Sequence, residues 1–346
     1  MRAMPQNNHV TIRDVASSAR VSTATVSRVI SGDGYVSTAT RERVERSIKK
    51  LGYSPSFAAQ SLRTKKSTVI GLVITDIKNP FYPELVSGIE NEAQSRGYSL
   101  ILCNSQEDTE RESGYLDYLA SHRTDGILIC VPGMADRQRE KLRKFMGPIV
   151  LLNENKVDTD FPTIAMDNFE GGKQIGEHLK EIGYKKIVYV GVEREVKDGL
   201  PRFEGLKKGA GVKVDYISSE DSVRDAEELV SRIVEKNKTP LAVVAHNDVS
   251  AISLMHEFMD LGFKIPEEVG IVGYDDIAMS ALVNPALTTV NQNLRRLAQL
   301  GLNTLETLLS GEKKSKGLEV SPELVVRGST VKSKSKSRAK AKKKGR

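Results

Sequence analysis

Polar side chains that follow apolar runs are the first candidates for chemistry in this sequence. Asn153, Asn247 and Asp275 each come just after a run of apolar residues long enough for a buried strand, and Arg202 stands just before an amphipathic stretch in "PRFEGLKKG". Amide, carboxylate and guanidinium groups are suited to hydrogen bonds with the hydroxyl groups of a small ligand. We interpret these four residues as candidate ligand-binding residues.

Two aromatic residues follow the apolar run at 69–74 in "TDIKNPFYPE". Exposed rings of Phe81 and Tyr82 could stack on a sugar or a base, so we predict them to be stacking partners of a ligand. The alternative for Phe81 is packing in the core. Asp276 is interpreted as a turn residue, and Asn104 fits a ligand contact and a structural role equally well.

The same residues argue against catalysis. Asp275 and Asp276 are adjacent, so their carboxylates point apart and cannot flank a substrate as a catalytic pair. The sequence contains no nucleophile elbow, no glycine loop for phosphate and no His/Cys set at metal spacing. Cys103 and Cys130, the only cysteines, are predicted to be buried reduced thiols. We therefore expect no enzyme, no metal and no cofactor.

The elements that must position the candidate ligand-binding residues alternate along the chain from Val69 onward. Apolar runs alternate with amphipathic stretches, which is typical of parallel sheets covered by helices on both faces. In such folds ligands bind beyond the carboxyl ends of the strands. Strands are predicted at 69–74, 99–103, 126–131, 148–152, 186–190, 241–245 and 268–272, and helices at 83–96, 109–122, 136–145, 169–182, 203–209, 223–236, 248–261 and 293–309.

Residues 9–51 form a separate pattern of three short helices, with Thr11, Ser22 and either Ser37 or Thr38 as N-caps. About three residues join the first two helices, which predicts a sharp helix-turn-helix corner that presents the second helix outward. Its outward side chains are short except for Arg28, which fits a helix seated in a DNA major groove. The alternative is a three-helix bundle with a solvated Ser/Thr face. The residues predicted to contact DNA here are Ser22, Thr23, Ala24, Thr25, Ser27 and Arg28.

Charge separates the two ends of the chain from its body. Residues 1–66 carry twelve Lys and Arg against four acids, a net charge of +8, and residues 332–346 carry nine basic residues and no acid. Because the whole chain has a net charge of +7, residues 67–331 have a net charge of −10. Basic ends on an acidic body favour a polyanion as partner of the ends. No apolar run approaches the roughly 20 residues of a membrane helix, and no signal core is present, so we predict a cytoplasmic protein without membrane contact.

Taken together, the motifs resemble the LacI/GalR family of bacterial repressors. The resemblance rests on "TIRDVASSARVSTATVSRVISGDGYVSTATRERV", "LGYSPSFAAQSLRT", "IGLVITDIKNPFY", "DNFEGG", "VGYDDIAMSALVNPALTTV" and "EVSPELVVRGST", in family order over nearly the whole chain. It implies an all-α helix-turn-helix head and a type I periplasmic-binding-protein-like core of two doubly wound parallel-sheet subdomains. It also implies a homodimer on a palindromic operator. One departure is Arg20, where the family commonly has Gly; a left-handed conformation there costs an arginine about 1 kcal/mol.

The resemblance gives a role to "SPSFAAQSLRT". In the family this segment is a hinge that becomes helical on the operator, where a leucine wedges into the minor groove. Here that leucine is Leu62, with Arg63 near the phosphates. Eight or nine residues are too few for a stable isolated helix, so folding must accompany binding. The alternative is a plain tether whose leucine packs against the next domain.

For the core, the resemblance implies that Arg202, Asn247 and Asp275 hold the effector, with Phe81 and Tyr82 as stacking partners. Asn153 stands where many relatives have Asp, and the segment after Arg202 is shorter than the family usually shows. We expect a small sugar or sugar phosphate as effector. The alternatives are a purine corepressor, and a sugar-binding protein without DNA function, which would carry a secretion signal instead of a helix-turn-helix.

The predicted domain order follows from these assignments. It consists of the head (9–54), the hinge (55–66), the core (67–331, with subdomains at about 67–166 plus crossing segments and about 167–290) and a disordered basic tail (332–346). The helix that starts at Pro83 and the segment at 279–287 are expected at the dimer surface. Two roles are open for the tail, which either adds nonspecific DNA affinity or only improves solubility.

Overall fold

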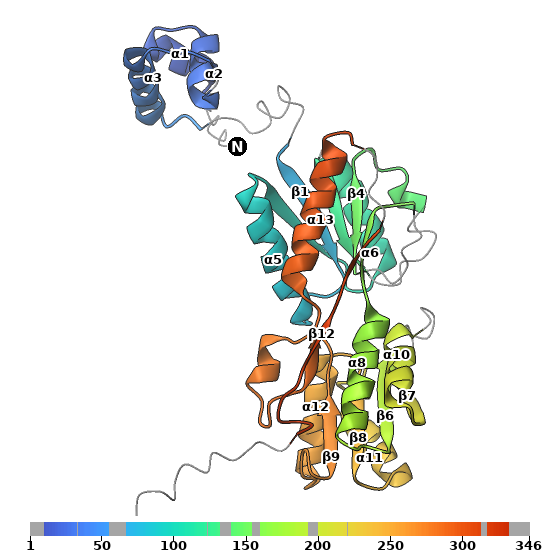
Figure 1. The fold of residues 1–346 in the computed structure, drawn as a ribbon. Coiled ribbons are helices and arrows are strands. Elements are labelled where there is room, and N and C mark those ends of the chain that lie inside the picture. The colour runs from blue at the N-terminus through green and yellow to red at the C-terminus, as the bar shows by residue number, and fades with distance from the viewer. Residues whose placement is uncertain are drawn as a thin grey trace, which may run out of the picture. The chain divides into compact units, whose positions relative to one another are not determined.

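The computed structural model describes residues 10–32, 34–54, 67–122, 124–131, 140–153, 160–192, 200–219, 221–312 and 317–331. The chain divides into two compact units, which meet in sequence between Thr68 and Val69 (Figure 1). The predicted hinge (55–66), the tail (332–346) and residues 136–139 of the helix expected at 136–145 lie outside the described residues.

The head contains the three predicted helices, α1 (Ile12–Ala19), α2 (Thr23–Ser31) and α3 (Thr38–Leu51). Its small core consists of Val15, Ala16, Ala19, Val26, Val29 and Val44. The carboxylate of Asp14 accepts hydrogen bonds from the backbone N–H (2.8 Å) and hydroxyl (2.7 Å) of Thr11, which fixes the start of α1. Ser37 is the N-cap residue of α3.

The corner between α1 and α2 closes through Arg20. Its φ and ψ of 52° and 51° place it in the left-handed region, and its backbone N–H bonds back to the end of α1. This conformation costs an arginine about 1 kcal/mol more than a glycine, as expected from the sequence. The corner therefore keeps a helix-turn-helix geometry although it lacks the glycine.

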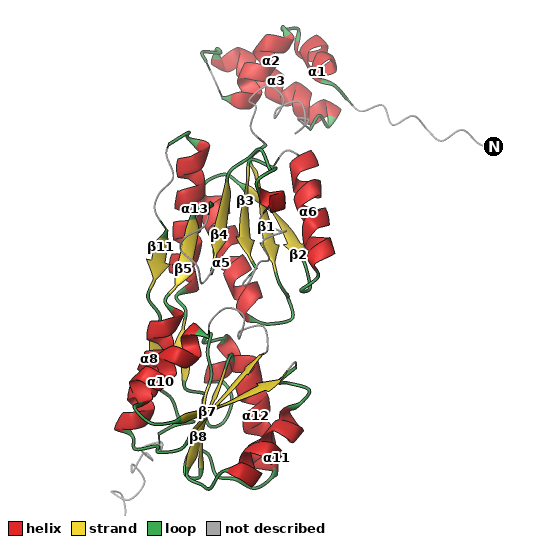
Figure 2. Ribbon diagram, turned by 90° about the vertical axis from the view of Figure 1, so that its right-hand side faces the viewer, coloured by secondary structure: helices red, strands yellow, loops and turns green. Residues whose placement is uncertain are grey.

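The first half of the core, which we call the N-subdomain, is built on a six-stranded sheet of parallel strands in the order β11-β5-β4-β3-β1-β2. Helices α5 and α13 cover one face and α6 covers the other (Figure 2). The bounds are β1 Val69–Ile74, α5 Phe81–Ser95, β2 Ser99–Asn104, α6 Thr109–Ser121, β3 Gly126–Cys130, β4 Ile149–Leu152, β5 Thr163–Met166, α13 Leu294–Leu309 and β11 Leu318–Val320.

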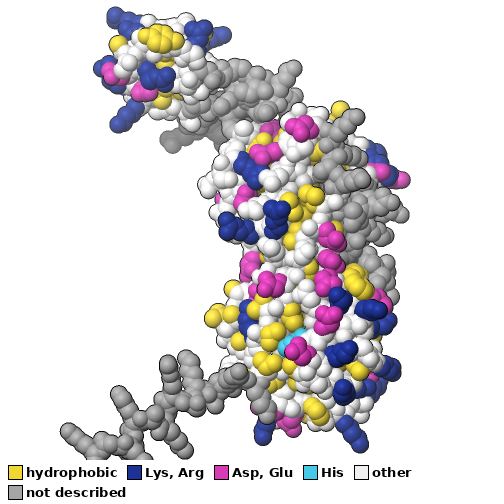
Figure 3. All heavy atoms as spheres, in the orientation of Figure 1, with side chains coloured by type: hydrophobic (Ala, Val, Ile, Leu, Met, Phe, Trp, Pro, Cys, Tyr) yellow, Lys and Arg dark blue, Asp and Glu magenta, His cyan; other side chains and the backbone are white. Residues whose placement is uncertain are grey.

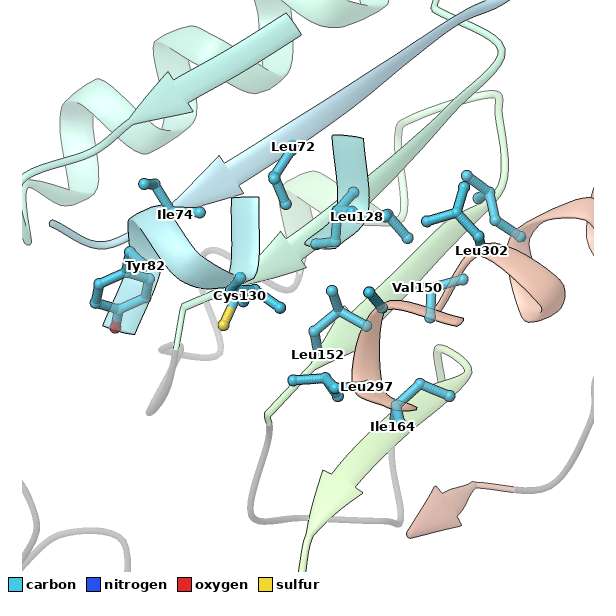
Figure 4. Close-up of a cluster of buried hydrophobic side chains, with 14 of the residues drawn as sticks. Leu72, Ile74, Tyr82, Leu128, Cys130, Val150, Leu152, Ile164, Leu297 and Leu302 are labelled. Atoms are coloured by element: carbon cyan, nitrogen blue, oxygen red, sulfur yellow. The ribbon is translucent and has the colours of Figure 1, made fainter. Parts of the chain in front are cut away.

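Aliphatic side chains from both layers fill the space between the sheet and the α5/α13 pair. Leu72, Leu128 and Val150 come from three neighbouring strands, and Leu297 and Leu302 come from α13 (Figure 4). All five are essentially inaccessible to solvent. Burial of this size fixes the sheet rigidly, and with it the ends of β1, β3 and β4, which face the second half of the core.

The second half, the C-subdomain, has a four-stranded parallel sheet in the order β7-β6-β8-β9. Helices α8 and α10 cover one face, and α11 and α12 cover the other. A short antiparallel pair, β10 and β12, lies beside α8. The bounds are α8 Asn168–Glu181, β6 Ile187–Val192, α10 Pro201–Ala210, β7 Val214–Ser219, α11 Ala226–Lys236, β8 Leu241–Ala245, α12 Asp248–Asp260, β9 Val269–Val272, the 3-10 turn η1 Ala278–Ala281, β10 Thr289–Asn291 and β12 Glu323–Val325.

The chain passes between the subdomains three times within the described elements: from β5 to α8, from β10 to α13 and from β11 to β12. These crossings hold each subdomain together from separate stretches of sequence. The backbone N–H of Asp167 in the first crossing donates to the carbonyl of Val320 in the third at 3.1 Å. The crossings meet where the strands of the two sheets end.

All seven predicted strands are present with bounds that differ by at most two residues, but five short strands were not predicted. These are β5, β7, β10, β11 and β12, which are three to six residues long. Helix α5 starts at Phe81 rather than at residue 83, because the Oδ1 of Asn79 accepts the backbone N–H of Phe81 at 3.1 Å. Cys103 and Cys130 are buried free thiols, as expected. No helix among the described residues is long and apolar enough to cross a membrane.

Candidate functional site

Helix α2 presents a short-chain polar face to solvent. Thr23, Ala24 and Arg28 are exposed, whereas Val26 and Val29 are buried against the other two helices of the head. Ser27 is half-buried on the outer side. Lys and Arg side chains are spread around the surface of the head (Figure 3). An exposed helix face of small residues with one arginine is compatible with close approach to base edges in a major groove.

Ser22 and Thr25 act within the head. The Oγ of Ser22 accepts the backbone N–H of Thr25 at 3.1 Å and lies 2.9 Å from its hydroxyl. The two side chains therefore satisfy the first turn of α2 and fix the angle at which the helix leaves the corner. Leu62 and Arg63, the other predicted DNA contacts, lie outside the described residues.

In the core, Arg202 connects the strand ends of the C-subdomain. It is the second residue of α10; its Nε donates to the Oδ1 of Asn168 at 2.9 Å, and its Nη1 donates to the carbonyl of His246 at 2.6 Å. Its guanidinium carbon lies 3.8 Å from the centre of the Tyr274 ring, a cation–π contact. These contacts come from α8, the end of β8 and the end of β9, so Arg202 sits where the C-subdomain faces the crossings.

Asp275 follows β9 at the same end of the sheet. Its side chain is buried, and its Oδ1 accepts a hydrogen bond from the Nε2 of Gln292 at 2.5 Å. Burial raises the pKa of Asp275 well above 3.8, although the nearby Arg202 cation acts in the opposite direction. A buried carboxyl group beside a guanidinium can bind two neighbouring hydroxyl groups of a ligand.

Asn247 has a structural role in addition to any ligand contact. Its Oδ1 accepts the backbone N–H of Ser250 at 2.8 Å and caps α12. Its Nδ2 lies 3.0 Å from the Nε2 of His246. The side chain is half-buried. One lone pair of its amide oxygen is therefore committed to the helix, and the second lone pair and the amide N–H groups are suited to a ligand.

Asn153 marks the N-subdomain side of this region. It follows β4, adopts a left-handed conformation with φ of 55°, and is buried. Its Oδ1 makes no hydrogen bond within the described part of the chain, and the same holds for the Oε1 of Gln292. Buried acceptors are normally paired, so two unpaired ones near strand ends are what a site for a polar ligand requires.

The prediction of exposed stacking rings at Phe81 and Tyr82 is wrong for this structure. Phe81 is 3% exposed and Tyr82 is 6% exposed. Both belong to the N-subdomain core, where Tyr82 lies in the cluster that contains Ile74 and Cys130 (Figure 4). Because Phe81 and Tyr82 form the first turn of α5, their rings turn inward onto the sheet, at an edge-to-face distance of 5.1 Å from each other.

Three further residues lie in this region and were not predicted as ligand-binding candidates: Asn168, Tyr274 and Gln292. Asn168 and Gln292 follow β5 and β10, two of the strands that were not predicted, so their positions at strand ends could not be recognised. Tyr274 comes between β9 and Asp275, and burial raises its pKa to about 12. Its place in the run "VGYDD" after a predicted strand was the available signal.

Asp276, interpreted as a turn residue, and Asn104, for which a ligand contact and a structural role were both open, make hydrogen bonds that hold loops. Asp276 accepts a hydrogen bond from the Nη2 of Arg327 at 2.6 Å and from the Nδ2 of Asn291 at 2.8 Å. Asn104 accepts the backbone N–H of Ile77 at 3.2 Å. The described residues contain no cluster of three or more His, Cys, Asp or Glu able to hold a metal ion.

Comparison with known proteins identifies the family to which this chain belongs. A model of periplasmic binding proteins and the sugar binding domain of the LacI family matches residues 67–316, and a model of bacterial regulatory proteins of the lacI family matches residues 11–56. The chain is 34% identical over 330 residues to the HTH-type transcriptional repressor PurR of Mannheimia succiniciproducens, covering 93% of this chain and 99% of the relative. It is 35% identical to the ribose operon repressor of Halalkalibacterium halodurans, covering 92% and 97%.

A solved structure supports the same assignment. The lac repressor dimer bound to operator and the anti-inducer ONPF matches with a TM-score of 0.83 and 26% identity, covering 93% of this chain and 99% of that chain. Both the head and the two-subdomain core are included in this match. The chain belongs to the LacI family of bacterial regulatory proteins, and it is therefore an effector-controlled DNA-binding regulator of transcription and not an enzyme.

Proposed function

We propose that this regulator represses transcription as a cytoplasmic homodimer on a palindromic operator, under the control of a small neutral sugar bound between the subdomains of its core. The names of the two relatives support repression, and the dimeric lac repressor on its operator supports a dimer. Two copies of the head on one dimer match two half-sites related by the same symmetry.

DNA reading is assigned to the outward face of α2. Thr23 and Ala24 are small enough to let the helix enter the major groove and to touch thymine methyl groups. Arg28, exposed one turn further on, has the reach and the planar fork for guanine O6 and N7. Ser22, Thr25 and Ser27 complete the surface, and Ser22 and Thr25 also hold the first turn of the helix.

Residues 55–66 are assigned to the hinge. Leu62 is the wedge between base pairs and Arg63 the neighbouring phosphate contact, because an apolar wedge bends DNA and makes the binding energy depend on the sequence that is bent. Leu62→Ala should lower affinity for the operator more than affinity for random duplex. An equal loss on both duplexes contradicts this assignment.

The dimer surface is assigned to α5 and to the segment at 279–287. Met279 is 54% exposed and Leu282 is 77% exposed. Two large apolar side chains this close together on one turn favour burial against a partner. Sedimentation equilibrium of the full chain tests the assignment, since a monomer at micromolar concentration excludes it.

The single observation that supports the effector site best is the set of polar groups at the strand ends. Arg202, Asp275 and Asn247 lie at the strand ends of the C-subdomain, and Asn153 at the end of β4 offers a buried acceptor that no described residue satisfies. The hydroxyl groups of a sugar act as donor and acceptor at once, so they can serve each of these groups.

Charge favours a neutral sugar over a sugar phosphate. The Nε and Nη1 of Arg202 already donate to protein oxygens. Next to it, Asp275 lines an open cavity of about 340 Å³ together with Glu84, Asp276 and Arg295. A phosphate dianion in this cavity would meet the two carboxylates of Glu84 and Asp276 against the single cation of Arg295.

A purine is the second candidate. Phe169, which is 43% exposed, directly follows Asn168, a hydrogen-bond partner of Arg202. An exposed ring at this position is a possible stacking surface for a base. Phe81 and Tyr82 are less suited to this role because both are buried in the core.

A thermal-shift screen with D-ribose, other pentoses, hexoses, ribose 5-phosphate, hypoxanthine and adenine distinguishes the two. A ligand at about 100 times its Kd adds about 2.7 kcal/mol to the stability of the folded chain. We expect a shift with a neutral sugar and none with its phosphate. A shift with a purine base and none with any sugar refutes the sugar assignment. Operator binding with and without the ligand then shows whether the ligand releases the DNA or tightens the complex.

A further inference from the structure

Arg20 combines an unfavourable backbone with an exposed cation at the corner of the head. Its left-handed φ and ψ are those that glycine adopts without strain. Its backbone N–H contributes to the end of α1, and Val21 N–H bonds to Ala16 O at 3.0 Å. A glycine would make the same backbone bonds at lower cost. What Arg20 adds to the corner is therefore its side chain.

The side chain of Arg20 lines an open groove between α1 and α2. The groove has a volume of about 720 Å³, and the polar residues around it are Arg13, Ser17, Arg20, Ser22 and Thr23. Arg13 and Arg20 are exposed, and neither has an acidic partner within the described residues 10–32 and 34–54. The groove thus carries two cations and three hydroxyl groups and no carboxylate.

A groove with this lining fits an oxyanion with several acceptor oxygens. Guanidinium groups bind phosphate oxygens through two parallel N–H groups, and hydroxyl groups donate to the remaining oxygens. Thr23 belongs both to this groove and to the outward face of α2. A DNA strand whose bases meet α2 therefore brings its backbone past the groove.

We propose that Arg20, together with Arg13, binds a backbone phosphate of the operator beside α2. The inference rests on DNA binding by α2. Arg20 then strengthens binding to any duplex and leaves the choice of sequence unchanged, because a phosphate contact carries no base information. The strain at the corner is retained for this contact, since strained residues concentrate at functional sites.

The test compares the full-length chain with Arg20→Gly, Arg20→Asn and Arg20→Lys. Each neutralised phosphate contributes about 0.9 to the slope of log affinity against log salt. A homodimer brings two copies of Arg20 to the duplex, so Arg20→Gly and Arg20→Asn should lower that slope by about 1.8, and Arg20→Lys should retain it. Between about 50 mM and about 200 mM salt, the affinity advantage of the wild type over Arg20→Gly should shrink about twelvefold. Operator and random duplex should be affected by the same factor.

Stability and charge are controlled separately. Arg20→Gly should unfold at the same or a higher temperature than the wild type, because glycine relieves the strain. Arg46→Ala removes one positive charge from the exposed surface of α3, outside the groove, and should leave the slope unchanged. Equal slope changes in Arg46→Ala and Arg20→Gly would mean that only net charge matters, and they overturn the proposal.

The outcomes separate this proposal from the function itself. If the wild type binds DNA and Arg20→Gly keeps its full salt dependence, only the role of Arg20 is overturned. If the wild type binds neither palindromic nor random duplex at any salt concentration, DNA binding by the head fails as well. A loss of affinity in Arg20→Gly on the operator alone contradicts a phosphate contact.

Discussion

Replacement of Gly205 by alanine tests whether the Arg202 site depends on the contact between α8 and α10. An ideal Cβ at Gly205 would lie 1.9 Å from the carbonyl oxygen of Phe169 on α8. The contact is repeated in register, since a Cβ at Gly172 would lie 1.9 Å from the carbonyl oxygen of Arg202, and one at Gly209 would lie 2.1 Å from that of Lys173. The two helices therefore touch backbone to backbone.

The magnitude follows from two opposing effects. Ordinary van der Waals contact begins at 3.4 Å, so alanine at position 205 requires the helices to separate by about 1.5 Å or to rotate. Overpacking of this kind costs about 3 kcal/mol, toward the upper end of the usual range, because backbone cannot move aside as a side chain can. Alanine regains about 1 kcal/mol of helix propensity. We expect Gly205→Ala to lower the free energy of unfolding by about 2 kcal/mol.

Gly114 provides a matched control within the same chain. It lies in the middle of α6, is exposed, and has no atom within 4 Å of an ideal Cβ. Gly114→Ala should raise the free energy of unfolding by about 0.5 to 1 kcal/mol, because only the propensity effect remains. The change from glycine to alanine should thus lower the free energy of unfolding at Gly205 and raise it at Gly114.

Urea unfolding followed by circular dichroism measures both variants, and a thermal-shift titration with the effector measures the site. Separation of α8 and α10 also pulls Asn168 from the Nε of Arg202, now 2.9 Å away, so Gly205→Ala should weaken effector binding as well. A Gly205→Ala chain that is as stable as the Gly114→Ala chain refutes the close contact and the positioning of Arg202 derived from it.

Three further predictions concern the core and the tail. Arg202→Lys should weaken effector binding at least about tenfold in a calorimetric titration, because lysine cannot donate to Asn168 and His246 in the same geometry. Burial raises the pKa of Asp275 above 3.8, so the contribution of this carboxyl group to stability is complete below about that pH and is lost as the pH rises through the folded-state pKa. The free energy of unfolding of Asp275→Asn relative to wild type should therefore increase from about pH 4 to about pH 8 in urea unfolding. A difference between the two chains that stays constant with pH contradicts the burial argument. Deletion of residues 332–346 should reduce the salt slope of binding to random duplex if the tail contacts DNA, and an unchanged slope leaves the tail only a solubilising role.

The sequence alone was sufficient for the class of fold and for most of its elements. Hydrophobic periodicity and caps are local properties, so the three helices of the head and the long strands of the core could be read directly. Short strands such as β5 and β10 could not, because four or three residues carry no periodic signal and pair only when a neighbouring strand is present. Asn168 and Gln292, which follow those strands, were missed for that reason.

The sequence also predicted the chemical types of the candidate site, since Asn247 and Asp275 follow predicted strands and Arg202 precedes a predicted helix. Tertiary structure decided which atoms are free to act. It turned Phe81 and Tyr82 into the core, committed one lone pair of the Asn247 amide oxygen to a helix cap, and left the Oδ1 of Asn153 buried without a described partner. Burial and hydrogen-bond partners depend on segments far apart in the chain, and no local pattern of residues contains them.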